Sequence, residues 1–230
     1  TPIEISLSIN IPIGSGLGSS AAVTVATLAA LFDYHDIPFT KESLAQDAYN
    51  VELDVQGMAS PLDTMVSTYG GLIYLSREKK PISFTNHINS NFVIGFTTKY
   101  GNTGKMVKNV KNLKDAYPNI INPIIEDMGF IANEARIAIL KNDISKVGEL
   151  MNINQGLLDS LGVNTSELSR MIYLARKNGA LGSKITGSGG GGSIIALCPH
   201  NPDKVMKALN RYDNTFKIKF SKDGVLTKDS

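Results

Sequence analysis

An α+β fold with two lobes is predicted by three observations on the sequence. Strand-like alternation opens the chain, long runs with helical spacing follow it, and the chain ends on the order strand, strand, helix, strand. With 230 residues the chain is long enough for one large domain or two small ones. We therefore expect a first lobe over residues 1–90, which holds a glycine-rich loop, and a helix-rich second lobe over residues 91–230.

The first lobe is predicted to begin with a strand and to continue with three helices. Apolar and polar residues alternate over residues 3–9, which is the pattern of a half-buried strand. Thr40 and Ser60 are expected as helix N-caps, and Pro61 suits the first position of the helix that follows. The expected helices span residues 20–34, 40–55 and 60–69, a strand spans residues 72–75, and residues 76–90 form an exposed connection.

The second lobe is predicted to contain five helices and four strands. Asp143 and Thr165 are expected as N-caps, and Gly179 as a stop signal. The expected strands span residues 92–97, 184–186, 194–198 and 215–220, and the expected helices span residues 103–117, 123–140, 144–158, 166–177 and 202–211.

The composition is that of an ordinary globular protein and excludes several classes of function. Hydrophobic residues make up 42% of the chain and charged residues 19%, and the net charge of +2 gives no basic excess typical of nucleic-acid binding. No apolar run reaches membrane-spanning length. We therefore expect neither a nucleic-acid partner nor a membrane partner, and a cytoplasmic location.

The cysteine and histidine residues show no pattern of a metal or disulfide site. Cys198 is the single cysteine and lies in an apolar run, so we expect it in the core and expect no disulfide framework. His35, His87 and His200 lack the spacing of metal ligands and are expected at the surface.

The first glycine cluster joins the predicted strand to the first long helix. Residues 11–22 read Ile-Pro-Ile-Gly-Ser-Gly-Leu-Gly-Ser-Ser-Ala-Ala. Gly14, Gly16 and Gly18 allow positive φ and close approach to the backbone, and a helix N-terminus at Ser19 and Ser20 favours an anion. The spacing fits a phosphate-binding loop and a plain tight turn equally well, and the loop contains no lysine.

A second glycine cluster lies between two predicted strands of the second lobe. Four successive glycines, residues 189–192, are costly to order because glycine loses the most backbone entropy. One interpretation is a short linker. The other is close approach of the backbone to a ligand or to the first loop, which is favoured because strand residues flank the cluster on both sides.

Two carboxylates carry alternative interpretations. Asp63 follows Ser60 by three residues, so it is either part of a capping box or a base held at a helix start. Glu52 near a helix end is either solvated or compensated by a cation such as Mg²⁺, since an acid is unfavourable there. Mg²⁺ binds few protein oxygens and bridges to phosphates, so the hydroxyl of Ser20 with Glu52 would be a sufficient protein set.

Three motifs in the same order resemble those of the GHMP kinases. Residues 12–22 resemble their phosphate-binding motif, and residues 184–192, Lys-Ile-Thr-Gly-Ser-Gly-Gly-Gly-Gly, resemble their third, glycine-rich motif. Within this superfamily, residues 60–71 are similar to the segment of mevalonate kinases that holds the catalytic aspartate. Residues 151–159 also resemble archaeal members of that family, so the resemblance covers almost the whole chain.

The resemblance implies a GHMP kinase fold, with a ribosomal protein S5-like N-terminal lobe, here truncated, and a ferredoxin-like C-terminal lobe. It implies ATP-dependent phosphorylation of mevalonate to 5-phosphomevalonate, with Mg²⁺, and with Asp63 as the base or charge partner of the accepting hydroxyl. Ser20 and Glu52 would hold Mg²⁺. The implied ATP-binding residues are Pro12, Gly14, Ser15, Gly16, Leu17, Gly18, Ser19 and Ser20, and the implied substrate-binding residues are Thr103, Gly187, Ser188 and Gly189.

The sequence departs from this family at its start. GHMP kinases carry a first motif with a lysine and a Gly-Glu-His segment, and nothing in this sequence matches it. The chain is therefore expected to be a fragment of a longer kinase or a truncated product. Phosphomevalonate kinase, homoserine kinase and a non-catalytic nucleotide-binding fragment stay open as alternatives, although Glu52 argues against diphosphomevalonate decarboxylases, which lack that acid. Whether the chain forms a homodimer is also open.

Overall fold

The computed structural model describes residues 3–11, 16–57, 59–76, 78, 80–84, 90–97, 101–210, 214–218 and 220–227. The contacts divide the chain into two compact units. Unit 1 comprises Thr1–Ser83 with Ser221–Ser230, and unit 2 comprises Phe84–Phe220. Each unit is described by itself.

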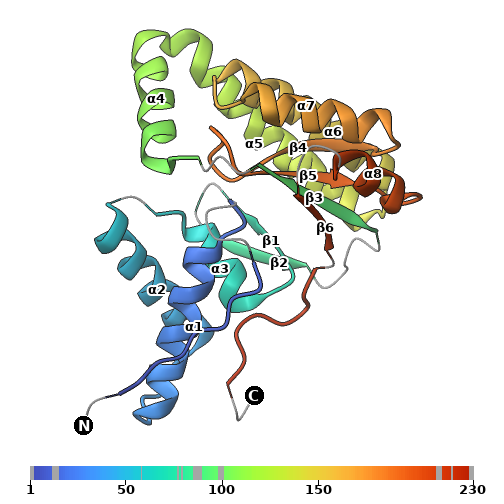
Figure 1. Ribbon diagram of the computed structural model, residues 1–230. Coiled ribbons are helices and arrows are strands. Elements are labelled where there is room, and N and C mark those ends of the chain that lie inside the picture. The colour runs from blue at the N-terminus through green and yellow to red at the C-terminus, as the bar shows by residue number, and fades with distance from the viewer. Residues whose placement is uncertain are drawn as a thin grey trace. The chain divides into compact units, whose positions relative to one another are not determined.

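Among its described residues, unit 1 is built from three helices, which pack against one another, and from a two-stranded sheet (Figure 1). Small side chains let helices α1 and α2 approach closely around a core of Val25, Ala29, Leu44 and Ala48. The elements are α1 (Ser19–Tyr34), α2 (Lys41–Gln56), α3 (Pro61–Tyr69), β1 (Leu72–Leu75) and β2 (Pro81–Phe84).

The start of α2 is fixed by a capping box. The hydroxyl of Thr40 accepts from the backbone N–H of Ser43 at 3.1 Å, and the hydroxyl of Ser43 accepts from the N–H of Thr40 at 3.0 Å. Two otherwise unpaired donors of the helix end are thereby satisfied. The predicted N-cap Thr40 and the predicted position of Pro61 at the first turn of α3 are both confirmed.

The strand predicted over residues 3–9 is wrong for this structure. The described residues 3–11 form no regular element. A strand needs a neighbour for its N–H and C=O groups, and none of the described strands pairs with this segment. Its apolar side chains are therefore 42% to 55% exposed, namely Ile3, Ile5, Leu7 and Ile9.

Two further features of unit 1 differ from the sequence prediction. Strand β2 lies inside the segment that was expected to be an exposed connection. Residues 221–227, expected in the second lobe, pack with unit 1, because the N–H of Gly71 donates to the carbonyl of Ser221 at 2.8 Å. The N–H of Val225 also donates to the carbonyl of Thr68, at 3.3 Å.

Unit 2 is organised around an antiparallel sheet with the strand order β4-β5-β3-β6. Its strands are β3 (Phe92–Phe96), β4 (Gly182–Thr186), β5 (Ser193–Leu197) and β6 (Asn214–Ile218). Along the chain these strands follow the order strand, helices, strand, strand, helix, strand. This order and the strand arrangement are those of a ferredoxin-like sheet, as expected.

Helices of unit 2 cover one face and one edge of this sheet (Figure 1). Residues of α7 and α8, including Met171 and Leu209, pack on the strands around Val93 and Ile194. Cys198 belongs to this core as predicted, and burial raises the pKa of its thiol to about 12. The helices are α4 (Thr103–Ala116), α5 (Pro118–Leu140), α6 (Ile144–Ser160), α7 (Ser166–Lys177) and α8 (Pro202–Leu209).

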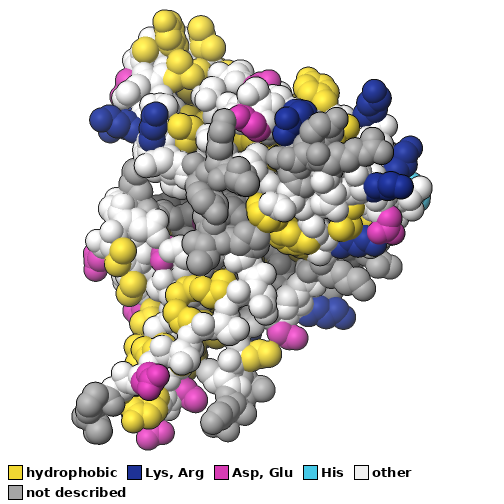
Figure 2. Space-filling view, viewed as in Figure 1, with side chains coloured by type: hydrophobic (Ala, Val, Ile, Leu, Met, Phe, Trp, Pro, Cys, Tyr) yellow, Lys and Arg dark blue, Asp and Glu magenta, His cyan; other side chains and the backbone are white. Residues whose placement is uncertain are grey.

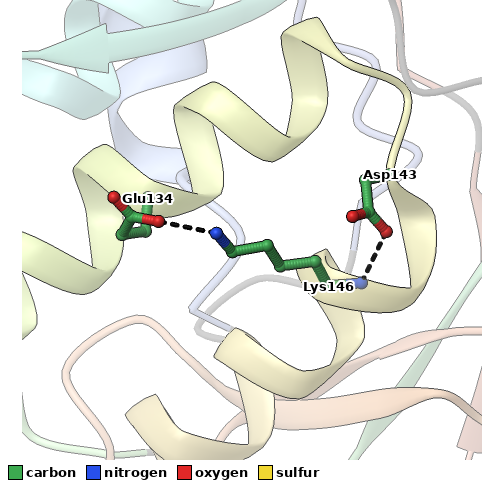
Figure 3. Close-up of polar contacts among 3 residues, drawn as sticks. All are labelled: Glu134, Asp143 and Lys146. Atoms are coloured by element: carbon green, nitrogen blue, oxygen red, sulfur yellow. Dashed lines mark hydrogen bonds and ion pairs between the residues drawn. The ribbon is translucent and has the colours of Figure 1, made fainter.

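Helices α5 and α6 pack as an antiparallel pair, and Lys146 contacts both of them (Figure 3). Its ammonium donates to Glu134 of α5 at 2.7 Å, and its backbone N–H donates to the N-cap side chain of Asp143 at 3.0 Å. The N-cap is as predicted. Helix α5 begins at Pro118 rather than at Pro123, because Pro118 already suits its first position and Pro123 is accommodated inside the helix.

The described surface carries charges of both signs. Figure 2 shows basic and acidic side chains interspersed over unit 2, and apolar side chains at the end formed by the α4–α5 turn. Tyr117 and Ile120 at this turn are 56% and 61% exposed. His35 and His200 are exposed as predicted, whereas His87 lies outside the described residues. Within the described ranges, no helix has both the length and the apolarity needed to cross a membrane.

Candidate active site

The N-terminus of α1 is preceded by glycines in the left-handed conformation. Gly16 has φ 76° and Gly18, the N-cap, has φ 73°. The first turn contains no acidic residue and receives no side-chain cap, so its N–H groups and partial positive charge can face an anion. Pro12, Gly14 and Ser15, which the resemblance assigns to ATP, lie outside the described residues.

Ser20 and Glu52 come from different helices and meet in unit 1. The hydroxyl of Ser20, in the first turn of α1, donates to Oε1 of Glu52 near the end of α2 at 2.9 Å. The packing of α1 on α2 therefore brings together the two residues proposed from the sequence as cation ligands.

Two residues that sequence reasoning missed complete this cluster. The hydroxyl of Thr24 donates to Oε1 of Glu52 at 2.6 Å. The amide Nε2 of Gln56 lies 2.8 Å from Oε2 of Glu52 and 3.0 Å from the hydroxyl of Ser20. Thr24 follows Ser20 by one helical turn, and Gln56 follows Glu52 in the same way, so the i, i+4 spacing was the available signal.

This cluster fits a cation that is also bound by phosphate oxygens. Within the described residues, no group of three or more His, Cys, Asp or Glu side chains could hold a metal by itself. A hydroxyl and a carboxylate that lie within hydrogen-bonding distance can, however, turn their lone pairs toward one point. That donor set suits Mg²⁺, which takes one or two protein oxygens and completes its shell with water and phosphate.

Asp63 occupies the third position of α3 and faces the glycine loop. Its Oδ1 lies 3.9 Å from the position that a Cβ on Gly18 would take. The side chain keeps contact with solvent, but desolvation by the surrounding atoms raises the pKa of its carboxyl. The charge of Glu52 also raises this pKa, and a hydrogen bond with Ser60 lowers it. Asp63 therefore lies beside Gly18 and senses the charge of Glu52.

The capping interpretation of Asp63 finds little support in the geometry. Ser60 is the N-cap of α3, but its side chain makes no cap hydrogen bond. A capping box requires that bond together with its reciprocal partner. Asp63 is a first-turn acid near the positive end of α3 and is bonded to Ser60, so the helix-dipole part of that interpretation stands although the capping box is not formed.

The second group of predicted residues lies in unit 2. The hydroxyls of Thr103 and Ser188 lie 3.1 Å apart, which joins the start of α4 to the loop between β4 and β5. Asn102 caps α4 by accepting from the N–H of Lys105 at 2.9 Å. Thr103 and Ser188 thus form one polar cluster, with Gly187 and Gly189 on either side of Ser188.

Gly189 of this loop is required by a close backbone contact. A Cβ on Gly189 would lie 2.3 Å from the carbonyl oxygen of Val163, and Gly189 has φ 78°. The N–H of Gly190 donates to that same carbonyl at 2.8 Å. A Cβ on Gly101 would lie 2.2 Å from the carbonyl oxygen of Gly189. The loop therefore packs against the residues before α4 and before α7. These contacts argue against the interpretation of the glycines as a short linker.

The strand that leads into this loop is held along its outer edge by side chains. The N–H of Ile185 donates to Oε1 of Gln155 at 2.8 Å, and the N–H of Ser183 donates to Oδ1 of Asn152 at 3.1 Å. The amine of Lys184 donates to the carbonyl of Ile185 at 2.7 Å. Desolvation lowers the pKa of Lys184 to about 8.

Two family models match the chain on either side of its centre. The model described as "GHMP kinases N terminal domain" matches residues 1–71, and the model described as "GHMP kinases C terminal" matches residues 135–215. The first matched range includes Ser20, Glu52 and Asp63, and the second includes Ser188.

Curated relatives and solved structures agree with these matches. The chain is 47% identical to a mevalonate kinase of Methanothermobacter thermautotrophicus, over 98% of this chain and 74% of that protein. It is 40% identical to a mevalonate kinase of Pyrococcus abyssi, over 98% of this chain and 68% of that protein. The crystal structure of the Methanococcus jannaschii mevalonate kinase superposes with a TM-score of 0.77 at 29% identity, over 91% of this chain and 66% of the other.

Proposed function

Because the chain belongs to the GHMP kinases and, within them, to the mevalonate kinase family, we propose that it phosphorylates mevalonate through Ser20, Glu52 and Asp63. ATP-dependent phosphorylation of mevalonate is the reaction of that family. The observation that carries the residue assignment is the convergence of these side chains beside Gly18 within unit 1.

Asp63 is assigned to the accepting hydroxyl. A carboxylate beside the loop that binds phosphate can accept the proton of that hydroxyl or orient it toward the γ-phosphoryl group. The raised pKa supports this role, because a carboxylate of higher pKa is a stronger base once it is ionised. The first turn of α1, which receives no side-chain cap, is assigned together with Gly16 and Gly18 to the phosphates of ATP.

Ser20 and Glu52 are assigned to Mg²⁺. Ser20 and Glu52 would hold the cation, which would supply neutralisation of the charge on the phosphates. The chain's own contribution is to hold a hydroxyl and a carboxylate in fixed positions through the packing of α1 on α2. Positioning and charge neutralisation supply most of the catalysis in phosphoryl transfer.

Thr103 and Ser188 are assigned to the substrate, with Gly187 and Gly189 beside them. The support is their hydrogen bond, which presents two hydroxyls at the edge of the loop in unit 2. One of the solved relatives, the L. major mevalonate kinase in complex with R-mevalonate, superposes with a TM-score of 0.76 at 28% identity, over 89% of this chain and 66% of that one.

An ADP-release assay on the full chain tests the proposed function. We expect ADP to be released with mevalonate and Mg²⁺, and not with homoserine or galactose. Turnover with homoserine or galactose but none with mevalonate would contradict the substrate assignment. Binding of ATP without turnover on any of these acceptors would favour a nucleotide-binding chain without catalysis.

A further inference from the structure

We propose that the side-chain amide of Gln56 competes with a cation for the oxygens of Ser20 and Glu52, and that it is displaced when a cation binds there. This inference rests on the proposed function, because it concerns the cation assigned to those two residues. It adds a positioning role for Gln56 and for Thr24, neither of which was expected from the sequence.

The position of the amide nitrogen supports this role. Nε2 of Gln56 lies 3.0 Å from Oγ of Ser20 and 2.8 Å from Oε2 of Glu52. A primary amide has two N–H donors, so one can serve each oxygen. The nitrogen therefore points positive N–H dipoles at both residues that are assigned to the cation, as the cation itself would point its charge.

Cation and amide compete for the same oxygens. Mg²⁺ binds oxygen at about 2.0–2.1 Å, well inside the hydrogen-bonding distances of the amide. N–H hydrogens directed at the same oxygens would face the cation with like charge. Gln56 is the last residue of α2 and is exposed, so its side chain can turn into solvent without disturbing the core.

Thr24 differs from Gln56 in where it contacts Glu52. Its hydroxyl donates at 2.6 Å to Oε1, and the contact is partly buried between α1 and α2. Among the described contacts its hydroxyl bonds Glu52 and not Ser20, so it can hold the carboxylate while the amide departs. Thr24 therefore keeps Glu52 in place, and Gln56 is the side chain that a bound cation displaces.

The test measures binding of Mn²⁺, as a substitute for Mg²⁺, by electron paramagnetic resonance on the full chain with a saturating non-hydrolysable ATP analogue. Gln56→Met keeps the length and helix propensity of the side chain but removes both donors. A net intramolecular hydrogen bond corresponds to about a two- to tenfold change in an equilibrium constant, so we expect Mn²⁺ to bind about two- to tenfold more tightly.

The matched control is Gln46→Met on the same helix. Gln46 donates to Asn50 at 3.0 Å with the same i, i+4 spacing, away from the cluster, and its replacement should leave Mn²⁺ binding unchanged. Thr24→Val should weaken Mn²⁺ binding, and Thr24→Ser should restore it, because serine keeps the donor. Thermal melting of each variant confirms that it is folded.

The outcomes separate this inference from the proposed function. If Gln56→Met binds Mn²⁺ as the wild type does, or more weakly, the displacement inference is wrong while the cation site stands. If Glu52→Gln binds Mn²⁺ as tightly as the wild type, the cation is not at Glu52, and both the proposed cation site and this inference are overturned.

Discussion

The surroundings of the Asp63 carboxyl group disfavour its ionised form. Desolvation is the largest cause of its raised pKa, the charge of Glu52 is the next, and the hydrogen bond with Ser60 acts in the opposite direction. Bound phosphate and a cation would change both contributions, so the shift applies to the chain without ligands. In that state the proton of Asp63 is held more tightly than that of an ordinary aspartate.

We therefore expect the pKa of Asp63 to lie above its ordinary value of 3.8 and to fall when Glu52 is replaced by Gln. Carbon NMR titration of the Asp63 carboxyl in the ligand-free chain measures both. Since the base must be ionised, kcat/KM should fall as the pH falls through this raised pKa. A pKa at or below 3.8, or one that Glu52→Gln leaves in place, would contradict the assigned causes.

Replacing Asp63 by Asn should separate catalysis from helix capping. If Asp63 is a general base, kcat should fall by about two to four orders of magnitude. Stability at neutral pH should not fall. An acid whose pKa is higher in the folded than in the unfolded chain destabilises the fold above its folded pKa, and this effect is lost as the pH falls below the unfolded pKa.

Asp203→Asn is the matched control for this replacement. Asp203 is also a first-turn acid in a helix that begins with proline, and it pairs with Lys217 at 2.6 Å on the exposed surface. Removing this exposed pair should change stability little and kcat not at all. A lower melting temperature with unchanged kcat in Asp63→Asn would restore the capping interpretation.

The sequence indicated some members of the cluster around Glu52 and not others, for a geometric reason. Ser20 and Asp63 stand at helix starts, where capping and dipole arguments single out polar residues. Thr24 and Gln56 lie inside or at the end of helices, where a polar residue usually faces solvent. Their importance depends on α1 facing α2, which no local pattern specifies.

At the scale of elements, helix α6 takes the place of a neighbouring strand beside β4. Strand β4 is an edge of its sheet, so one side of its backbone has no strand partner within the described sheet. Asn152 and Gln155, three residues apart on α6, supply side-chain partners for the N–H groups of Ser183 and Ile185. An edge covered in this way cannot pair with another chain, and the loop that follows starts from a fixed strand.

The close approach of α6 to β4 depends on Gly148. A Cβ there would lie 2.7 Å from Cβ and 2.9 Å from the carbonyl carbon of Leu181. The backbone of Leu181 can move away from an added Cβ only at a cost in free energy. Gly148→Ala should therefore destabilise the chain by about 1–3 kcal/mol. Urea denaturation followed by circular dichroism measures the change.

Gly156 on the same helix provides the control. Among the residues that the structure describes, nothing lies within 4 Å of the position that its Cβ would take. Gly156→Ala should therefore stabilise the chain by about 0.5–1 kcal/mol, since alanine loses less backbone entropy in a helix. Equal effects of the two replacements would show that the packing of α6 on β4 is loose.

Most helices could be predicted because a helix satisfies its own backbone, so its period and its caps are local signals. The bounds of α7 match the prediction for this reason. A strand depends on partners elsewhere in the chain. The alternation of residues 3–9 was a strand signal without a described partner, and the short β2, which begins with proline, gave too little signal.

At the scale of the whole molecule, unit 1 includes both ends of the chain. The tail over residues 221–227 contributes Val225 to the core formed by α1 and α2, beside Leu28 and Phe32. Unit 1 therefore owes part of its stability to residues that follow unit 2 in sequence. The domain assignment in which residues 91–230 form the second lobe remains a proposal, and the tail contacts argue for moving residues 221–227 to the first.

The attachment of this tail depends on Gly224, and its replacement should loosen unit 1 alone. A Cβ on Gly224 would lie 2.2 Å from the carbonyl oxygen of Thr68 and 2.6 Å from the nitrogen of Gly70. Both are backbone atoms, so Gly224→Ala must lift the tail away and break the hydrogen bond from Gly71 to Ser221. We expect a loss of about 1–3 kcal/mol of stability in unit 1.

Amide hydrogen exchange measures this effect unit by unit. Exchange at the N–H of Gly71 and of Val225 should become faster in Gly224→Ala, because both donate to partners in the α3–tail contact. The N–H of Cys198, which donates to the carbonyl of Asn91 within unit 2, should keep its protection.

Leu226→Ala is the control, since this neighbouring side chain is 64% exposed. Equal exchange at Gly71 in both variants would mean that the tail does not stabilise unit 1, whereas faster exchange at Cys198 as well would mean that the two units unfold together.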